Sequence, residues 1–511
     1  MPPLTQSRLV APKDPHVLAF HLPQYHPIPE NDDWWGPGFT EWTNVTRGRP
    51  LFQGHYQPHL PADLGFYDLR LPEVREQQAA LAREAGLNGF VHYHYWFHGR
   101  RLLERPVNEI LESKQPDFPF CFCWANEPWS RNWDGKSSQI LMPQTYSSED
   151  DLRHIQWLLE AFADDRYIKI DGRPVFLVYR PAHLPDMRRT ADLWRSEAQK
   201  RGFPDLYLCA VRSFLKEFCD AAVFGMDVSV EFKPNGTDCG LPLTSPDPLE
   251  IGYRLHHVWD YDSMVDYSLT LPLPDYRLFP GVCPAWDNSV RRKEVGTIFR
   301  NSSPDKYEAW LREVLIRENL RPQKESLVFV NAWNEWAEGN HLEPCQRWGH
   351  GYITATRNAI EAAREHRIAL AGLGRGQIVS PDPDFRISGN LDRIVMANGR
   401  IVLDGWCTET ESMMPPDLMA YAELLDDGSY RLLAPVEMQR MARPDVVQHH
   451  GTKQSLLCGW SGDQIQPPEN VLSRLHLLAL RARGAAAAVL CRVCGVAGLL
   501  ACAHSAINPV A

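Results

Sequence analysis

The stretch "SLVFVNAWNEWAEGNHLEP", residues 326–344, joins a short apolar run to a cluster of polar and aromatic side chains. Its first eight residues have the β-branched and aromatic composition of a strand that is buried on both faces. Three glutamates, Glu335, Glu338 and Glu343, follow this run closely and stand near two tryptophans. A buried strand that ends in carboxylates predicts a functional site at the carboxyl end of a parallel sheet.

Seven other short apolar runs have the same character, and helical patterns separate most of them. Strands buried on both faces that alternate with helices favour a parallel sheet. Eight such units in about 370 residues predict an α/β fold, a (β/α)8 TIM-type barrel. An open doubly wound sheet is the alternative, but the chain has no G-x-G-x-x-G or Walker loop to support it. The eight expected strands are 16–22, 88–96, 118–124, 173–179, 205–211, 221–226, 281–286 and 326–333.

Residues 303–320 illustrate the helical pattern. Ser303 is a capping residue and Pro304 suits the first turn. The apolar residues then recur at helical spacing, which predicts a helix that packs one stripe against the sheet. They are Tyr307, Trp310, Leu311, Val314 and Leu315.

The chain divides into two expected domains. Residues 1–370 hold the barrel, and the Gly- and Pro-rich stretch that follows predicts a linker over 371–384. Residues 385–511 contain strand-like segments and an Asp427-Gly428 turn signal, which predict a C-terminal β-rich module resembling a small sandwich. Its Ala- and Cys-rich tail after residue 484 approaches the length of a membrane span, but Arg492 lies inside it, so no stable membrane span is expected.

Composition narrows the class of protein. The chain has 53 Lys and Arg against 64 Asp and Glu, a formal net charge of −11 without a basic patch, so nucleic acid is not an expected partner. The twelve cysteines lack a disulfide framework, and Cys491-x-x-Cys494 lacks the second pair of a zinc site. No basic and apolar leader opens the sequence, which predicts a cytoplasmic location.

Glu335 and Glu338 form the pair on which the function is argued. If the strand ends near Trp333 and a turn or helix follows, residues three apart share one face, with their Cβ atoms about 5–6 Å apart. Retaining glycosidases need two carboxyl groups roughly 5–5.5 Å apart, whereas inverting ones need about 6.5–9.5 Å. The spacing therefore favours retention, with a solvated glutamate pair on a helix as the alternative.

Three other patterns compete with this pair. Asn126-Glu127-Pro128 matches the acid/base signature of many barrel glycosidases, although it follows the third strand and not the fourth. His92 and His94 share one face of a strand, as metal ligands do, but later strands offer no partners. Asp260-Tyr261-Asp262 matches the D-x-D pattern of glycosyltransferases, without a nucleotide-binding βαβ unit around it.

Residues from about 15 to 367 resemble the glycoside hydrolase family 99-like domain of the WbsX type, found in bacterial proteins for lipopolysaccharide and other surface polysaccharides. The motifs that carry the resemblance are "FHLPQYHPIPENDDWWGPGFTEWTNV", "GHYQPHLPADLGFYDLRLPEVREQQAALA", "YHYWFHGRRLLERP", "FCWANEPWSRNWDG", "PAWDNSVRR" and "NAWNEWAEGNHLEP".

Related family 99 enzymes are retaining endo-α-mannosidases with an Asn-Glu-Trp-x-Glu-Gly motif, which residues 334–339 match. The resemblance implies that Glu335 acts as a base on the substrate 2-hydroxyl, giving an anhydro-sugar intermediate, and that Glu338 is the general acid/base. Ala337 stands where those mannosidases carry His, a difference that bears on sugar specificity.

The sequence thus predicts an enzyme that acts on glycosidic bonds of a polysaccharide or oligosaccharide through Glu335 and Glu338, without metal or organic cofactor. A glycosyltransferase that depends on Asp260 and Asp262 is the first alternative, and a glycan-binding barrel without catalysis is the second. Aromatic and polar residues near the strand ends are the expected substrate contacts. They are Tyr25, Trp34, Trp35, Glu41, Trp42, His94, Tyr95, Trp124, Asn126, Glu127, Trp129, Trp286, Asp287, Asn334, Trp336 and Glu343.

Overall fold

The structure is a computed structural model, and it describes most of the chain between residues 14 and 492. The described ranges of the N-terminal domain are 14–131, 136–234, 256–271, 274–292, 295–321 and 325–371. The described ranges of the C-terminal part are 376–382, 384–397, 400–410, 415–416, 418–435, 439–441, 445–446, 448, 459–465, 475–481 and 486–492.

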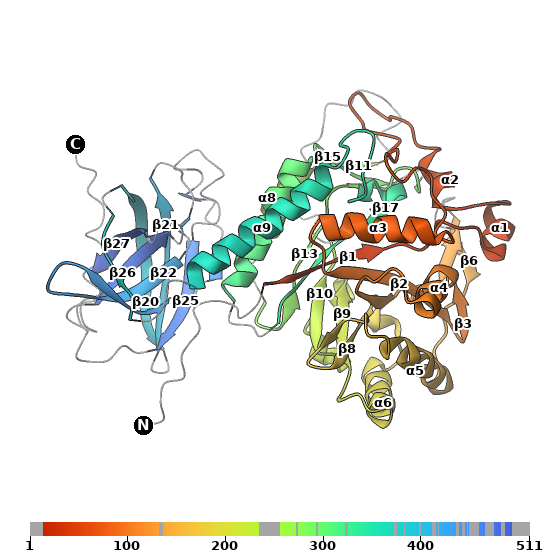
Figure 1. Ribbon diagram of the computed structural model, residues 1–511, viewed down its shortest axis with the longest axis horizontal. Helices are drawn as coiled ribbons and strands as arrows, with labels where there is room; N and C mark the ends of the chain where they lie inside the picture. Colours follow the sequence, from red (N-terminus) through yellow and green to blue (C-terminus); the bar gives the residue numbers. More distant parts are fainter. Residues whose placement is uncertain are drawn as a thin grey trace.

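A closed parallel barrel forms the N-terminal domain (Figure 1). Its strands follow the order β12-β10-β9-β8-β4-β2-β1-β16-β13. The short β12 and β13 flank Pro280 and together make one position, since β12 pairs with β10 and β13 pairs with β16. The predicted (β/α)8 fold is confirmed. The barrel strands are β1 (His16–His21), β2 (Gly89–Phe97), β4 (Phe120–Trp124), β8 (Arg173–Val178), β9 (Tyr207–Arg212), β10 (Val228–Glu231), β12 (Leu278–Phe279), β13 (Gly281–Val282) and β16 (Leu327–Val330).

Helices pack around this barrel (Figure 1). In α8 the Ser303 hydroxyl caps the first turn by accepting from the Lys306 amide at 3.5 Å, and the five predicted apolar residues are all buried. The predicted helix over 303–320 is therefore confirmed. The helices of this domain are α1 (Pro29–Trp35), α2 (Glu41–Val45), α3 (Pro72–Glu84), α4 (Arg105–Ser113), α5 (Ser148–Phe162), α6 (Met187–Lys200), α7 (Tyr261–Thr270), α8 (Pro304–Asn319) and α9 (Gly351–Ala371).

Two of the expected strands differ from the structure. The run 221–226 is not a strand: Ala221–Phe224 is a 3₁₀ turn, η4, which the Asp220 side chain caps by accepting from the Ala222 amide. The sixth barrel strand, β10, starts after it at Val228. Of the run 281–286, only Gly281 and Val282 join the barrel, because the chain then leaves it for β14 (Trp286–Asp287). That strand belongs to a separate small sheet with β11 (His257–Asp260) and β15 (Thr297–Arg300).

The C-terminal region consists of two antiparallel sheets beyond the end of α9 (Figure 1). The predicted hairpin is present: Gly428 has a φ of 83° and lies between the paired strands β22 and β23. The strand β19 lies within the expected linker and pairs with β23. One sheet contains β19 (Ile378–Val379), β23 (Tyr430–Pro435), β22 (Leu418–Leu424), β26 (Leu475–Arg481) and β27 (Ala486–Arg492), and the other contains β20 (Ile387–Ala397), β21 (Arg400–Glu409), β25 (Gly459–Ile465) and β24 (Gln439–Met441).

The Ala-rich tail starts as a strand, since Ala486–Arg492 forms β27, and its later residues lie outside the described ranges. No helix within the described ranges is long and apolar enough to cross a membrane. The described residues also include no group of three His, Cys, Asp or Glu side chains placed to hold a metal ion. Cys494 of the Cys-x-x-Cys pair is not among them.

Candidate active site

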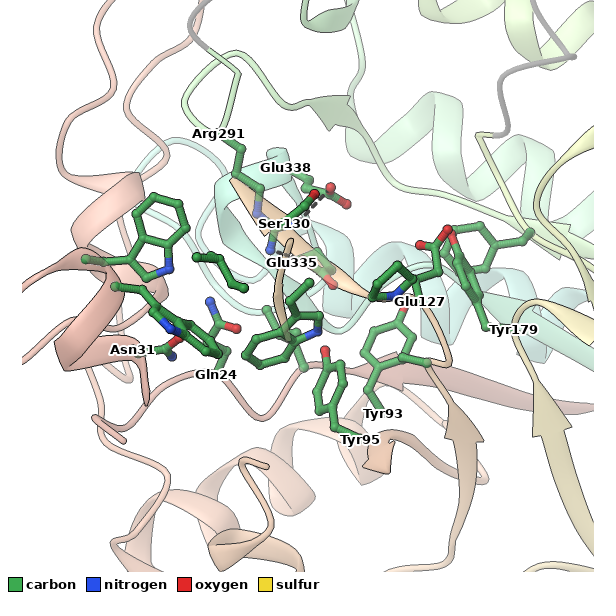
Figure 2. A pocket seen from close by; sticks show the side chains of 18 of the residues that line it. Gln24, Asn31, Tyr93, Tyr95, Glu127, Ser130, Tyr179, Arg291, Glu335 and Glu338 are labelled. Carbon is green, nitrogen blue, oxygen red and sulfur yellow. Dashed lines mark hydrogen bonds and ion pairs between the residues drawn. The ribbon is translucent and has the colours of Figure 1, made fainter. Parts of the chain in front are cut away.

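A cavity of about 290 Å³ opens at the carboxyl ends of the barrel strands (Figure 2). Eight of the predicted site residues line it: Trp34, Trp35, Tyr95, Glu127, Trp129, Trp286, Glu335 and Glu338. The remaining wall is formed by Leu22, Gln24, Asn31, Tyr93, Ala125, Pro128, Ser130, Leu141, Tyr179, Phe232 and Arg291.

The two glutamates are positioned by the segment that follows β16. Glu335 ends the short strand β17 (Asn334–Glu335), and Glu338 ends the single 3₁₀ turn η6 (Trp336–Glu338). Gly339 then adopts a φ of 56°, and a Cβ atom there would lie 3.1 Å from the Asp287 Cβ and 3.2 Å from the His59 ring. A glycine is therefore required where the chain turns back into β18 (Asn340–His341).

Arg291 connects the two glutamates. Its Nη2 lies 2.8 Å from Glu335 Oε2 and its Nη1 lies 2.7 Å from Glu338 Oε1. Its Nε lies 2.7 Å from Glu41 Oε1, and the Gln24 amide donates to the other oxygen of Glu41 at 3.0 Å. Figure 2 shows the Arg291 side chain reaching towards both Glu335 and Glu338. One guanidinium thus faces three carboxylates.

This arrangement changes the acidity of the pair. Burial, opposed by Arg291 and aided by the charges of Glu338 and Glu41, raises the pKa of Glu335 to about 8. Burial also raises the pKa of Glu338, and Arg291 again opposes it. Since one positive charge faces three carboxylates, the ionised forms are not fully compensated. The pair therefore retains a shared proton near neutral pH.

Aromatic rings surround the carboxylates. Tyr93 and Tyr95 project from β2 towards Glu335, whose charge adds to the effect of burial in raising the pKa of both tyrosines (Figure 2). The Trp129 ring packs edge-on against Tyr95, with 5.1 Å between ring centroids, and against Trp34 at 5.8 Å. Such faces stack on sugar rings, and the phenol and indole groups also donate hydrogen bonds.

Asn31 adds a free donor to this wall. It is 1% exposed, and its amide nitrogen has no hydrogen-bond partner among the described residues. A buried donor without a partner costs free energy unless a ligand or water satisfies it, so Asn31 offers a hydrogen-bond donor to a ligand in the cavity.

Glu127 lies on the opposite side of the cavity and forms an ion pair with Arg180. The buried Asn126 supports this pair, because its side-chain oxygen accepts from the Arg180 amide at 2.8 Å and its nitrogen donates to the Arg180 carbonyl at 2.9 Å. Asn126 thus connects the loops after β4 and β8 and does not line the cavity.

Ten predicted site residues do not line the cavity, and most of them instead support its loops: Tyr25, Glu41, Trp42, His94, Trp124, Asn126, Asp287, Asn334, Trp336 and Glu343. Asn334 ties β17 to the end of β1, since it accepts from the Leu22 amide at 2.7 Å and donates to the Leu22 carbonyl at 3.0 Å. The Tyr25 hydroxyl donates to the Asn334 carbonyl. The Trp42 indole donates to the Tyr67 carbonyl at 2.8 Å.

Glu343 is the centre of a buried network behind the glutamate pair. It accepts from the Trp336 indole at 2.6 Å, from the Gln78 amide at 2.7 Å and from the Tyr67 hydroxyl at 2.9 Å. Burial raises the pKa of Glu343 to about 7, and these donors oppose the change. Trp336 also stacks on His341 at a centroid distance of 3.8 Å.

The remaining predicted residues pack away from the cavity. His94 stacks on His154 and Trp157 of α5, on the outer face of β2. The Trp124 indole donates to the Trp96 carbonyl at 3.1 Å. Asp287 is buried with His55, whose ring nitrogen is 2.6 Å away.

Two of the three rival patterns have structural roles. Asp260 caps α7 by accepting from the amides of Asp262 and Ser263, and Asp262 pairs with Lys306 at 2.8 Å. His92 and His94 both lie on the outer face of β2, and neither lines the cavity.

Sequence reasoning missed several residues of the cavity: Gln24, Asn31, Tyr93, Ser130, Tyr179 and Arg291. Arg291 had a usable signal, because buried carboxylates need a compensating cation and the motif "PAWDNSVRR" follows a strand end. Tyr93 also had one, because it alternates with His94 and shares a strand face with Tyr95.

A parallel barrel with an acidic, aromatic-lined cavity at its mouth is the architecture of a class of carbohydrate-active enzymes. The family model described as glycosyltransferase WbsX matches residues 17–356, and the chain belongs to this family.

Two curated relatives are similar over 354 residues at 44% identity, both described as uncharacterized protein WxcX. They come from the B100 and ATCC 33913 strains of Xanthomonas campestris pv. campestris. The match covers 68% of this chain and 50% of each relative, so the chain spans about half the length of the curated relatives it matches.

Solved structures of the GH99 endo-alpha-mannosidase from Bacteroides thetaiotaomicron are also similar. One, in complex with BIS-TRIS-propane, has a TM-score of 0.43 at 14% identity, over 69% of this chain and 98% of that one. A second has a TM-score of 0.42 at 15% identity, over 68% of this chain and 98% of that one.

Proposed function

We propose that this protein is a retaining endo-glycosidase that acts on glycosidic bonds within a bacterial surface polysaccharide, using Glu335 and Glu338. The observation that carries the proposal is the placement of both carboxylates on one guanidinium in the wall of an aromatic-lined cavity. The barrel supplies the catalytic unit, and the β-rich region from residue 385 is an accessory module.

The shared contact with Arg291 and the match of residues 334–339 to the motif of retaining enzymes support retention. Two nitrogens of a single rigid guanidinium hold Glu335 and Glu338, which keeps their carboxyl groups close together. Retaining enzymes use carboxyl groups about 5–5.5 Å apart, and inverting enzymes need roughly 6.5–9.5 Å to admit a water between them and the sugar.

In the first step Glu335 accepts the proton of the substrate 2-hydroxyl, and the 2-oxygen forms a bond to the anomeric carbon. The bond from the anomeric carbon to the leaving oxygen breaks, and Glu338 donates its proton to that oxygen. The product of this step is an anhydro-sugar. The raised pKa of Glu335 makes its ionised form a stronger base than an ordinary glutamate, which suits proton abstraction from a hydroxyl.

In the second step Glu338 accepts a proton from the incoming hydroxyl group, whose oxygen bonds to the anomeric carbon. The bond between the anomeric carbon and the 2-oxygen breaks, and Glu335 returns the proton to the 2-oxygen. Two displacements at the same carbon restore its original configuration. Water as the incoming group gives hydrolysis, and a sugar hydroxyl gives transfer.

Transfer is the second candidate function, because the matched family is described as a glycosyltransferase. It is distinguished by its donor, a nucleotide- or lipid-linked sugar. Asp260 and Asp262 are engaged in a helix cap and an ion pair with Lys306, which favours the glutamate pair as the reacting groups.

The test is turnover of the purified protein on a panel of surface polysaccharides and activated α- and β-glycosides. Glu338→Gln removes the proposed acid while it keeps the side-chain shape, so we expect a loss of about 10³-fold or more. Glu73→Gln, on the exposed face of α3, is the matched control and should leave turnover unchanged. Transfer from a sugar nucleotide that persists in Glu338→Gln, with no release from any polysaccharide, would contradict the proposal.

A further inference from the structure

A second hollow, of about 450 Å³, lies beside the catalytic cavity. Trp35 and Arg291 line both, so the two spaces are neighbours across these side chains. We propose that this arginine hollow, defined by Trp35, Asn44, Arg47, Arg49 and Arg291, binds an anionic group on a sugar next to the one that reacts. This inference rests on the proposed function and names its substrate class, an acidic polysaccharide.

The charges of the two spaces are opposite. Three glutamates line the catalytic cavity, whereas the arginine hollow is lined by three arginines and by no Asp or Glu from the described part of the chain. Arg291 is already paired with carboxylates. Arg47 and Arg49 form no ion pair with any described residue, so their charges are available to a ligand.

A buried donor accompanies these arginines. Asn44 is 5% exposed, and its amide nitrogen lacks a hydrogen-bond partner among the residues that the structure describes. It lies on α2, three residues after Glu41, whose carboxylate contacts Arg291. The short helix therefore directs one side chain to Arg291 and another to the hollow.

Solvated surface arginines alone would not indicate a ligand, but a buried amide without a partner beside them does. An amide nitrogen and two guanidinium groups are all donors, and the groups that match such a set are acceptors with negative charge, a carboxylate or a phosphate. Trp35 adds an aromatic face for the sugar that carries the anion.

An acidic substrate needs a local cationic site on this protein, because the chain as a whole is negatively charged. The chain carries a formal net charge of −11, which repels a polyanion at long range. An acidic chain that reaches the glutamate cavity needs positive charge nearby, and Arg47 and Arg49 supply it at the adjoining position.

The test compares binding of matched probes by calorimetry. The probes are fragments of uronate-containing and of phosphate-containing bacterial polysaccharides, each paired with its neutral form made by carboxyl reduction or dephosphorylation. The parent should bind one acidic fragment about tenfold or more tightly than its neutral form, and the affinity should fall as salt rises. The two acidic classes distinguish a carboxylate from a phosphate ligand.

The double variant Arg47→Gln, Arg49→Gln should lose about tenfold or more in affinity for the acidic fragment and less than about twofold for the neutral one. Arg189→Gln with Arg364→Gln removes the same charge from exposed positions on α6 and α9 and should change neither affinity. Equal binding of acidic and neutral fragments by the parent, or an equal loss in the control variant, would overturn the arginine hollow.

The experiments distinguish a failure of the proposed function from a failure of the proposed anion site. Acid-selective binding that depends on Arg47 and Arg49, without turnover, would uphold the hollow and reject the endo-glycosidase. Turnover that depends on Glu338 but is equal on acidic and neutral substrates would support the proposed glycosidase and contradict the proposed anion site.

Discussion

Arg291 sets the charge balance of the cavity, because its guanidinium is the group that Glu41, Glu335 and Glu338 share. An arginine stays charged at any working pH. It therefore stabilises the ionised form of each neighbouring carboxylate and lowers its pKa. Burial works in the opposite direction and prevails at Glu335, whose pKa rises to about 8.

Arg291→Gln should move the pH dependence of the enzyme upward. The base must be ionised to act, so kcat/KM rises as the pH passes through its pKa. Removal of a cation that contacts both glutamates raises that pKa, and the ascending limb should shift to higher pH by about 1–3 units. Arg291→Lys keeps the charge and should shift it less. A profile of kcat/KM against pH measures the effect, and an unshifted limb in Arg291→Gln would argue against this role.

The sequence indicates which residues close together in the chain share one face, but it does not indicate contacts between distant segments or which face of a strand meets the cavity. Glu335 and Glu338 are three residues apart in the sequence, which predicts that they share one face, and both line the cavity. Arg291 is 44 residues from Glu335 along the chain, so no sequence spacing indicates their contact. On β2 the alternation of side chains allows either His94 or Tyr95 to face the cavity, and the structure selects Tyr95.

At the scale of elements, the loop after β16 is held by buried hydrogen bonds. Glu343 accepts from Trp336, Tyr67 and Gln78, and Asn334 fastens the loop to the end of β1. These residues were expected to touch substrate. Their burial and their full sets of partners instead make them the support that fixes Glu335 and Glu338.

Glu343→Gln should therefore lower the stability of the fold and leave substrate binding nearly unchanged. Glutamine has one acceptor oxygen, so donors that now meet both carboxylate oxygens cannot all be satisfied, at a cost of about 1–3 kcal/mol. We expect a lower unfolding temperature, and KM close to that of the parent at temperatures where the variant is folded. Glu73→Gln serves as the exposed control. An unchanged unfolding temperature with a raised KM would support direct substrate contact.

Most elements of the barrel could be predicted because a strand buried on both faces is a short, continuous apolar run. The run 221–226 shows the limit of this signal. Its apolar residues also suit a turn of helix, and the preceding Asp220 caps that turn. Length and composition do not separate the two outcomes for a run of this size. One barrel position is divided into β12 and β13 around Pro280, and none of the expected strands predicts this division.

At the scale of the whole molecule, the barrel brings distant loops to one mouth. Glu41 and Arg291 are in contact although 250 residues separate them. Gln24 and Asn31 come from the first loop, Glu127 from the loop after β4, and Glu335 from the loop after β16. Because all barrel strands are parallel, the topology guarantees that their carboxyl ends meet, which is why strand-end residues could be selected from sequence.

The stereochemistry of the reaction tests the central claim, that a glutamate pair held on Arg291 performs two displacements at one anomeric carbon. We would follow the parent by proton NMR on the polysaccharide that it turns over, and record the anomeric signal of the first product before it equilibrates. The account predicts a product with the configuration of the substrate and no product from Glu338→Gln. A first product of inverted configuration, or the same product from Glu338→Gln at the parent rate, would contradict it.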